Sequence, residues 1–201
     1  RVAAITSNFT QGPHLDSESY TAMAIDGDGF FAVRGADGNT YYTRNGDFKL
    51  SVGEDGNLTL VTADGFPVLD TNGNPIVFPG GIQASKMMVS SEGALGYLDG
   101  QNNYVALNQS IGLFQFNNPA GLDKLSNSLL GVTDASGEAM NEATTPNLVL
   151  STVRQGYLEG SNVQVADEMV NLIVAQRAYE MNSKAIQASD DMLGQANQLK
   201  R

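Results

Sequence analysis

The sequence has no cysteine, no tryptophan and a single histidine among its 201 residues. The absence of cysteine excludes disulfides, thiolate metal sites and cysteine nucleophiles. Basic residues are also scarce, since 11 Lys and Arg stand against 22 Asp and Glu, for a formal net charge of −11. Nucleic acids are bound through a basic face, so this balance argues against a nucleic-acid partner. No apolar run reaches the length of about 18 residues that a membrane span needs, and we expect no membrane insertion.

The chain contains two kinds of sequence. Short apolar and aromatic runs alternate with Asp-Gly, Asn-Gly and Gly-Asn pairs, which is typical of antiparallel strands joined by tight turns. We therefore predict a mainly β fold, with an antiparallel meander or barrel-like domain and a long C-terminal helix. The predicted parts are an N-terminal connector at 1–20, a β-rich outer domain at 21–155 and a C-terminal helix for axial coiled-coil assembly at 156–201. The pairs Phe30-Phe31 and Tyr41-Tyr42 are expected to face alternate sides of their strands.

After Gly160 the sequence contains no proline and one glycine, Gly194. Ser161 and Gln164 have the spacing of a capping box, and two acidic residues follow where the helix dipole favours negative charge. A helix of about 37 residues would be roughly 55 Å long, which is long for a domain of this size.

Apolar and small residues of this helix recur every seven positions, which is typical of a seam against another helix rather than of a face on a sheet. The predicted assembly seam consists of Val165, Leu172, Ala175, Ala178, Tyr179, Ala185, Ile186, Met192 and Leu193. We expect Gln176 and Asn182, at its edge, to fix the register, as buried polar residues do in coiled coils. The sequence offers no second helix of matching pattern and opens at Arg1 without a leader. We therefore expect a fragment that lacks its N-terminal partner helix, and a helix that frays in isolation.

The stretch AIDGDGFFAV at 24–33 matches the G-x-G-x-x-A pattern of dinucleotide-binding turns. In such a site the glycines open a helix whose N-terminus holds the pyrophosphate. Here the β-like FFAVR follows instead. We interpret Gly27, Asp28 and Gly29 as a hairpin turn, and we expect no cofactor.

Two further chemical patterns are weak. Asp70, Asn72 and Asn74 have the spacing of the first ligands in an EF-hand calcium loop, but Pro75 stands where that loop needs glycine. We expect no metal site. A catalytic triad would have to use His14, and no G-x-S-x-G or S-x-x-K motif occurs. The sequence therefore predicts no active site and a protein that is not an enzyme.

Two blocks of this sequence resemble the flagellar rod and hook family of bacterial axial proteins, and within it the distal rod. The first block, residues 156–193, reads GYLEGSNVQVADEMVNLIVAQRAYEMNSKAIQASDDML and resembles the terminal helix of the family. The second, within residues 24–69, contains AIDGDGFFAV and YYTRNGDFKLSVGEDGNLTLVTADGFPVL. The N-terminal helix that is usual in the family does not precede Arg1, in agreement with the unmatched seam.

The resemblance implies a structural subunit that is exported by the flagellar type III system and polymerises helically into the basal-body rod, the drive shaft between motor and hook. It implies as partners other copies of itself, neighbouring rod and hook subunits, and the P and L ring proteins, from periplasm to outer membrane. The alternatives are a proximal-rod or hook paralogue, or a secreted β-rich binding module or adhesin. An enzyme ranks below both.

Overall fold

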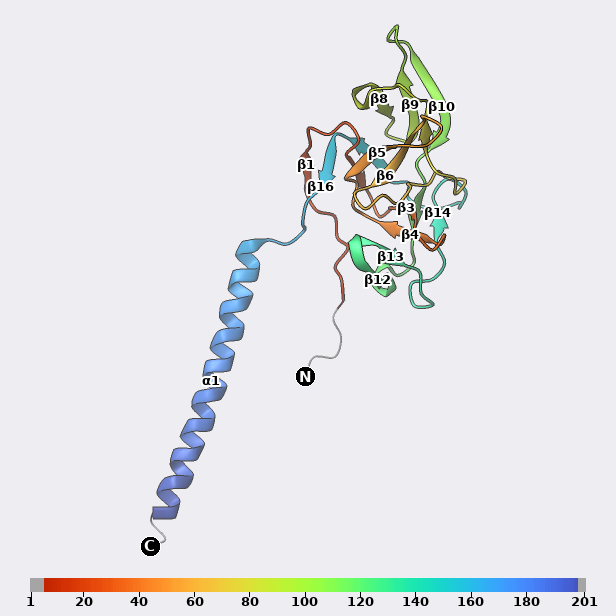
Figure 1. The fold of residues 1–201 in the computed structure, drawn as a ribbon. Coiled ribbons are helices and arrows are strands. Elements are labelled where there is room, and N and C mark those ends of the chain that lie inside the picture. The colour runs from red at the N-terminus through yellow and green to blue at the C-terminus, as the bar shows by residue number, and fades with distance from the viewer. Residues whose placement is uncertain (1–5, 199–201) are drawn as a thin grey trace. The chain divides into compact units, whose positions relative to one another are not determined.

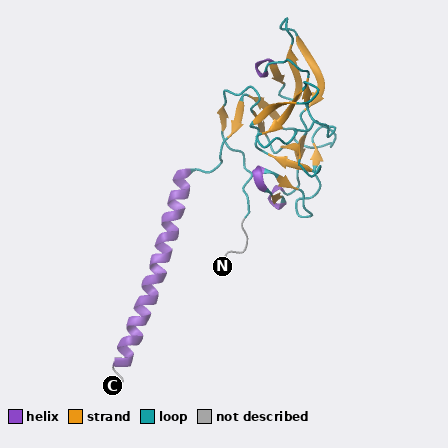
Figure 2. Cartoon of the chain, viewed as in Figure 1, coloured by secondary structure: helices purple, strands orange, loops and turns teal. Residues whose placement is uncertain are grey.

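The computed structural model describes residues 6–198, with the side chains of α1 described as far as residue 195. The chain divides into two compact units between Ser161 and Asn162. The first, called the β unit below, holds all the described strands, and the second is the single helix α1, Val165–Gln198 (Figures 1 and 2). The ends of the predicted connector and helical segments, residues 1–5 and 199–201, lie outside the described residues.

The β unit contains five antiparallel sheets among the described residues. The six-stranded sheet has the order β12 (Asp123–Lys124), β13 (Leu130–Gly131), β4 (Thr40–Thr43), β3 (Phe30–Arg34), β11 (Leu113–Gln115) and β14 (Met140–Asn141). The three-stranded sheets are β5 (Phe48–Val52), β6 (Leu58–Thr62) and β7 (Val77–Phe78), and β10 (Tyr104–Ser110), β9 (Ala94–Leu98) and β8 (Met87–Val89). The two-stranded sheets pair β1 (His14–Asp16) with β16 (Tyr157–Glu159), and β15 (Thr152–Gln155) with β2 (Met23–Asp26). Short 3-10 helices lie at Ala84–Lys86, Pro119–Gly121 and Ser126–Ser128.

The predicted mainly β fold with a long C-terminal helix is confirmed. The sheets do not close into a barrel within the described residues, and the meander is only local. Successive strands pair in β3–β4, β5–β6–β7 and β8–β9–β10, but β11 lies beside β3 and β15 beside β2. The six-stranded sheet and the two-stranded sheet of β2 and β15 are therefore completed by segments that are far apart in the sequence.

The turns follow the chemistry of their sequences. Gly38, Gly56 and Gly73 have φ between 74° and 80°, a backbone that glycine adopts without the steric cost of a Cβ. In the first of these turns Asp37 accepts a 2.7 Å hydrogen bond from the Tyr41 hydroxyl, which lowers the pKa of Asp37 and raises that of Tyr41. The Asp-Gly and Gly-Asn signals thus mark real turns.

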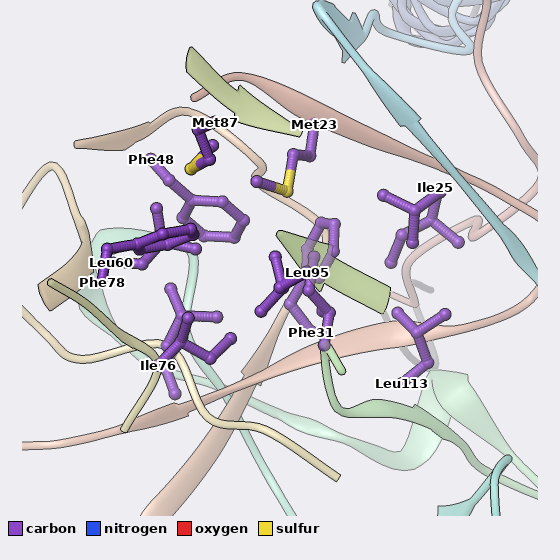
Figure 3. Close-up of a cluster of buried hydrophobic side chains, with 14 of the residues drawn as sticks. Met23, Ile25, Phe31, Phe48, Leu60, Ile76, Phe78, Met87, Leu95 and Leu113 are labelled. Carbon is purple, nitrogen blue, oxygen red and sulfur yellow. The ribbon is translucent and has the colours of Figure 1, made fainter. Parts of the chain in front are cut away.

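Strand β3 is buried on both faces, and its side chains divide two cores. Phe31 belongs to the larger core with Phe48 and Leu60, and the rings of Phe31 and Phe48 meet edge to face at 5.0 Å (Figure 3). Phe30 belongs to a smaller core with Phe116, at 5.6 Å between ring centroids. The predicted alternation is confirmed, and it also separates the next tyrosines, because Tyr41 packs on the larger core and Tyr42 on the smaller one.

The helix starts later than the capping-box pattern predicts. Strand β16 runs to Glu159, and the amide of Gly160 still donates a 2.8 Å hydrogen bond to the carbonyl of Pro13. The backbone therefore remains extended where the box would begin, and α1 starts at Val165. The capping box of Ser161 and Gln164 is wrong, although the acidic residues do lie in the first turn.

Candidate assembly interface

The large apolar side chains of helix α1 are exposed to solvent. Eleven large apolar residues between Val165 and Leu193 are exposed, from 48% for Ile173 to 77% for Tyr179. Soluble proteins rarely leave a continuous apolar surface of this extent uncovered unless it binds something. The helix is therefore the candidate interface of the chain.

Eight of the eleven exposed large apolar residues of α1 fall on two faces, whereas Val170 borders the second face and Met169 and Ile173 lie on the remaining side. In a helix of 3.6 residues per turn, each position is rotated by about 100° from the one before, so side chains seven apart stay nearly in line. The first face consists of Val165, Leu172, Ala175, Tyr179, Ile186 and Leu193. The second face consists of Val174, Ala178, Met181, Ala185, Ala188 and Met192. The two faces lie roughly 130° apart around the helix axis, and the second has the alternating four- and three-residue spacing of a coiled-coil seam.

The predicted seam is therefore not one surface. Val165, Leu172, Tyr179, Ile186, Leu193 and Ala175 fall on the first face, whereas Ala178, Ala185 and Met192 fall on the second. The two residues predicted to fix register also separate, by roughly 120° around the axis. Asn182 lies between the faces and Gln176 beyond the outer side of the first. The predicted seam also omitted three members of the second face whose spacing was readable, namely Val174, Met181 and Ala188.

A mainly charged face, which also includes Ile173, occupies the remaining side of the helix. It contains Arg177, Glu180, Lys184 and Asp191, all of them exposed. Charges of both signs are interspersed there, as is usual for a helix surface in water. The apolar faces and the charged face together give α1 a side for packing and a side for solvent.

In the β unit, a network of polar side chains surrounds Gly27 and Gly29. These glycines join β2 to β3, which lie in different sheets, so the predicted hairpin at Gly27, Asp28 and Gly29 is wrong. The link is a corner between sheets. The Gly27 amide donates to Gln11 Oε1 at 2.9 Å, and the Gly29 amide donates to Ser151 Oγ at 3.0 Å. Since both amides are engaged, neither is offered to a phosphate.

Arg44 closes this corner from one side. Its Nη1 donates to the carbonyl oxygens of Gly27 and Gly29, at 2.8 and 2.9 Å. Its Nε donates to Glu159 Oε2 at 2.9 Å, and Nη2 lies 2.8 Å from the same oxygen, completing the ion pair without a well-aligned hydrogen bond. The guanidinium carbon also lies 5.7 Å from the centre of the Phe30 ring. The remaining carboxylate oxygen of Glu159 accepts from the Gly12 amide at 3.0 Å.

Glu142 and Ser151 close the corner from the other side, and both are buried. The Glu142 carboxylate accepts from the Ser151 amide at 2.7 Å and from its hydroxyl at 2.8 Å. Gln115 Nε2 donates to the same carboxylate at 2.8 Å. A Cβ at Gly29 would lie 2.8 Å from Glu142 Oε1, so the corner leaves no room for a side chain there.

The first and last strands of the β unit lie beside each other. Strand β1 pairs with β16, with His14 opposite Glu159. The carbonyl of Pro13 accepts from the amide of Gly160, as described above. Residues 13 and 160 are thus side by side.

The other sequence motifs have structural roles. Asp70 is buried, and its Oδ1 accepts from the amides of Asn72 and Asn74, both at 2.8 Å. The stretch with the EF-hand spacing is therefore a turn that the Asp70 carboxylate stabilises by local hydrogen bonds. His14 Nε2 lies 2.9 Å from Gln11 Nε2 and 3.3 Å from the Ile25 carbonyl oxygen.

Within residues 6–198, no group of three or more His, Cys, Asp or Glu side chains could hold a metal ion. No described helix has the length and apolarity needed to cross a membrane.

Two stretches of the chain match known families. Residues 154–199 match the family described as flagellar basal body rod FlgEFG protein C-terminal, and residues 24–97 match the flagellar hook protein FlgE/F/G D1 domain. The first stretch contains α1 and strand β16, and the second contains the Gly27–Gly29 corner.

Similarity to individual proteins extends along the whole chain. The flagellar basal-body rod protein FlgG of Borreliella burgdorferi is 43% identical, over 100% of this chain and 72% of that relative. FlgG of Bacillus subtilis is 38% identical, over 89% of this chain and 65% of the relative. The flagellar hook-basal body complex protein FlhP of Bacillus subtilis is 34% identical, over 81% of this chain and 59% of the relative.

Proposed function

The chain belongs to the flagellar rod and hook family and is a structural subunit of the basal-body rod, of the FlgG type; from this premise we propose that it polymerises helically through the two apolar faces of α1. The rod built in this way transmits motor torque to the hook. The observation that carries the proposal is the exposure of all eleven large apolar side chains of α1 between Val165 and Leu193. A helix of this kind completes its packing only against other helices.

Two faces call for two helical neighbours. We propose that the first face packs against an N-terminal helix of the kind implied by the family, and the second against α1 of an adjacent copy. The pairing of β1 with β16 supports the first contact, because it brings the incoming and outgoing segments of the β unit together. The alanines of the second face support the other contact, since small side chains let two helix backbones approach closely.

The finer assignments are also proposals. Family membership supports assembly with other rod and hook subunits, and we propose contacts with the P and L rings and export by the flagellar type III system. We propose as domain roles a connector at 1–20, a β-rich outer domain at 21–155 and an assembly helix at 156–201. The relatives are structural flagellar proteins, and we propose that this chain likewise has no catalytic activity. The engagement of His14 by Gln11 and a backbone carbonyl supports that view.

The test of assembly is a matched pair of substitutions in the full-length protein. Ile186→Asp places a charge in the first face, and Gln187→Asp places the same charge on the adjacent polar side. We expect the first to abolish rod assembly and swimming, whereas the second leaves both intact. Both isolated chains should keep the same unfolding temperature of the β unit. Normal rods with Ile186→Asp would contradict the proposal.

A further inference from the structure

We propose that Arg44 and Glu159 form the connection through which force passes from α1 into the β unit, and that Arg44 is a positioning residue for the assembled shaft. We call these two side chains, with the Gly12 amide that Glu159 also binds, the Arg44–Glu159 lock. The proposal rests on the proposed function, because a subunit carries torque only within a rod.

Glu159 lies where the chain leaves the β unit. It is the last residue of β16, and the chain passes from the β unit to the helical unit two residues later, between Ser161 and Asn162. A pull on α1 therefore enters the β unit at Ser161 and reaches Glu159 two residues further along.

The local backbone pairing at this exit is weak. Strand β16 has three residues and pairs only with β1, which also has three, within the described residues. A two-stranded ribbon is marginally stable by itself. The ribbon is held on the β unit by the Gly156 amide, which donates to the Ala22 carbonyl at 2.8 Å, and by side-chain contacts near Glu159.

Arg44 supplies the side-chain contact at Glu159. Its guanidinium bonds Glu159 on one side and the carbonyls of Gly27 and Gly29 on the other, so it ties the ribbon to the corner between β2 and β3. The corner is itself fixed, since Ser151 and Gln11 bind its amides. The Gly12 amide adds the incoming segment to the same carboxylate.

Burial distinguishes this ion pair from an ordinary surface pair. The Arg44 and Glu159 side chains are 16% and 14% exposed, whereas the Arg154 and Asp26 side chains, at the same 2.8 Å separation, are 51% and 42% exposed. Solvated pairs contribute little, but removing one member of a shielded pair leaves its partner uncompensated. The Arg154–Asp26 pair, which joins β15 to β2, is therefore a natural control.

Hydrogen exchange of the 201-residue chain tests the lock. Glu159→Gln removes the charge with little change of shape, and Arg44→Lys keeps a charge but lacks the planar guanidinium whose separate nitrogens reach Glu159 and the two glycine carbonyls. For both variants we expect the amides of Gly160 and Ser17 to exchange at least about tenfold faster, while those of Leu60 and Val68 in the core are unchanged. Asp26→Asn should change none of them. The proposal would be overturned if hydrogen exchange became equally faster at the core amides and at the ribbon amides in both variants. It would also be overturned if exchange in both variants matched that of Asp26→Asn.

Force spectroscopy provides the mechanical readout. Because the chain has no cysteine, the substitutions Ser51→Cys and Gln164→Cys can attach handles across the lock. We expect the first opening event of Glu159→Gln at roughly half the force of the parent, with Asp26→Asn like the parent. Equal opening forces for Glu159→Gln and the parent would exclude the lock as the point of force transfer. Such a failure would leave helical assembly untouched, since assembly is tested separately by Ile186→Asp.

Discussion

Nε of Arg44 lies 2.9 Å from Oε2 of Glu159, across 115 positions of the sequence. This contact links the turn after β4 to the last strand before α1. With Ser151 and Glu142 on its other side, it explains why AIDGDGFFAV contains two glycines. The glycines form a corner whose backbone groups are bound by side chains from distant strands, and the stretch is structural rather than a cofactor site.

Gly46 is expected to tolerate no side chain. A Cβ there would lie 1.6 Å from the carbonyl oxygen of Met23, which is buried backbone and cannot move aside. We expect Gly46→Ala to lower the free energy of unfolding of the β unit by about 3 kcal/mol or more. Gly53→Ala is the control, since its nearest neighbour would be at 3.6 Å and its φ is ordinary. Urea unfolding measures both, and equal midpoints would contradict the close approach of Gly46 to Met23.

Ser151 is expected to contribute more to the stability of the β unit than its small side chain suggests. Ser151→Ala removes the acceptor of the Gly29 amide and a donor to Glu142, leaving buried polar groups unpaired. We expect a loss of about 1–3 kcal/mol in the free energy of unfolding. Ser51→Ala, on an exposed strand position, should stay within about 0.5 kcal/mol of the parent. Chemical denaturation of the two variants side by side checks the difference.

The turn at Asp37 should respond to acid. Its hydrogen bond from Tyr41 lowers the folded-state pKa of Asp37 below the ordinary 3.8. A lowered pKa means that the carboxylate stabilises the folded state above pH 3.8 and that this contribution disappears as the pH falls through the lower, folded value. We expect Tyr41→Phe to raise the pKa of Asp37 toward its ordinary value, which NMR titration of the carboxyl group can follow. An unchanged titration would refute the role of the hydroxyl.

The isolated helix should melt before the β unit. Its apolar side chains are exposed, and helices gain most of their stability from packing of an apolar face. We expect circular dichroism at 222 nm to fall gradually with temperature, ahead of a cooperative transition of the strands. A chain that ends at Ser161 should lack the gradual loss of helical signal and keep the cooperative transition of the strands. A single shared transition would mean that the two units stabilise each other.

Local features of this fold were predictable from sequence, and long-range pairings were not. Gly38 and Gly56 marked turns, and Phe30 and Phe31 were expected on opposite faces, because backbone sterics and the two-residue strand period act within a few positions. The partner of Glu159 could not be found in this way. Glu159 precedes a glycine and looks like any solvated turn residue until the strands are paired. Glu142, between Asn141 and Ala143, likewise gives no local sign of its partners.

The helix shows the same division. Its length and seven-residue repeat were readable, but the predicted seam merged Ala185 with Ile186, which point to different faces because adjacent positions are rotated by about 100°. The start was misplaced because β16 keeps the backbone extended through Glu159. The misplaced start arose where tertiary pairing decides the outcome, whereas the seam stays a prediction whose residues divide between two faces.

Helix α1 is proposed to be covered only in the assembly, and thiol reactivity at position 186 tests this most directly. Ile186→Cys would introduce the only thiol in the 201-residue chain, at a position where the native side chain is 64% exposed. We expect rapid maleimide labelling of the isolated chain and labelling at least about tenfold slower in purified rods of the full-length protein. Gln187→Cys, on the polar side, should react at similar rates in both. Equal reactivity of the Ile186→Cys thiol in the isolated chain and in rods would contradict assembly through α1.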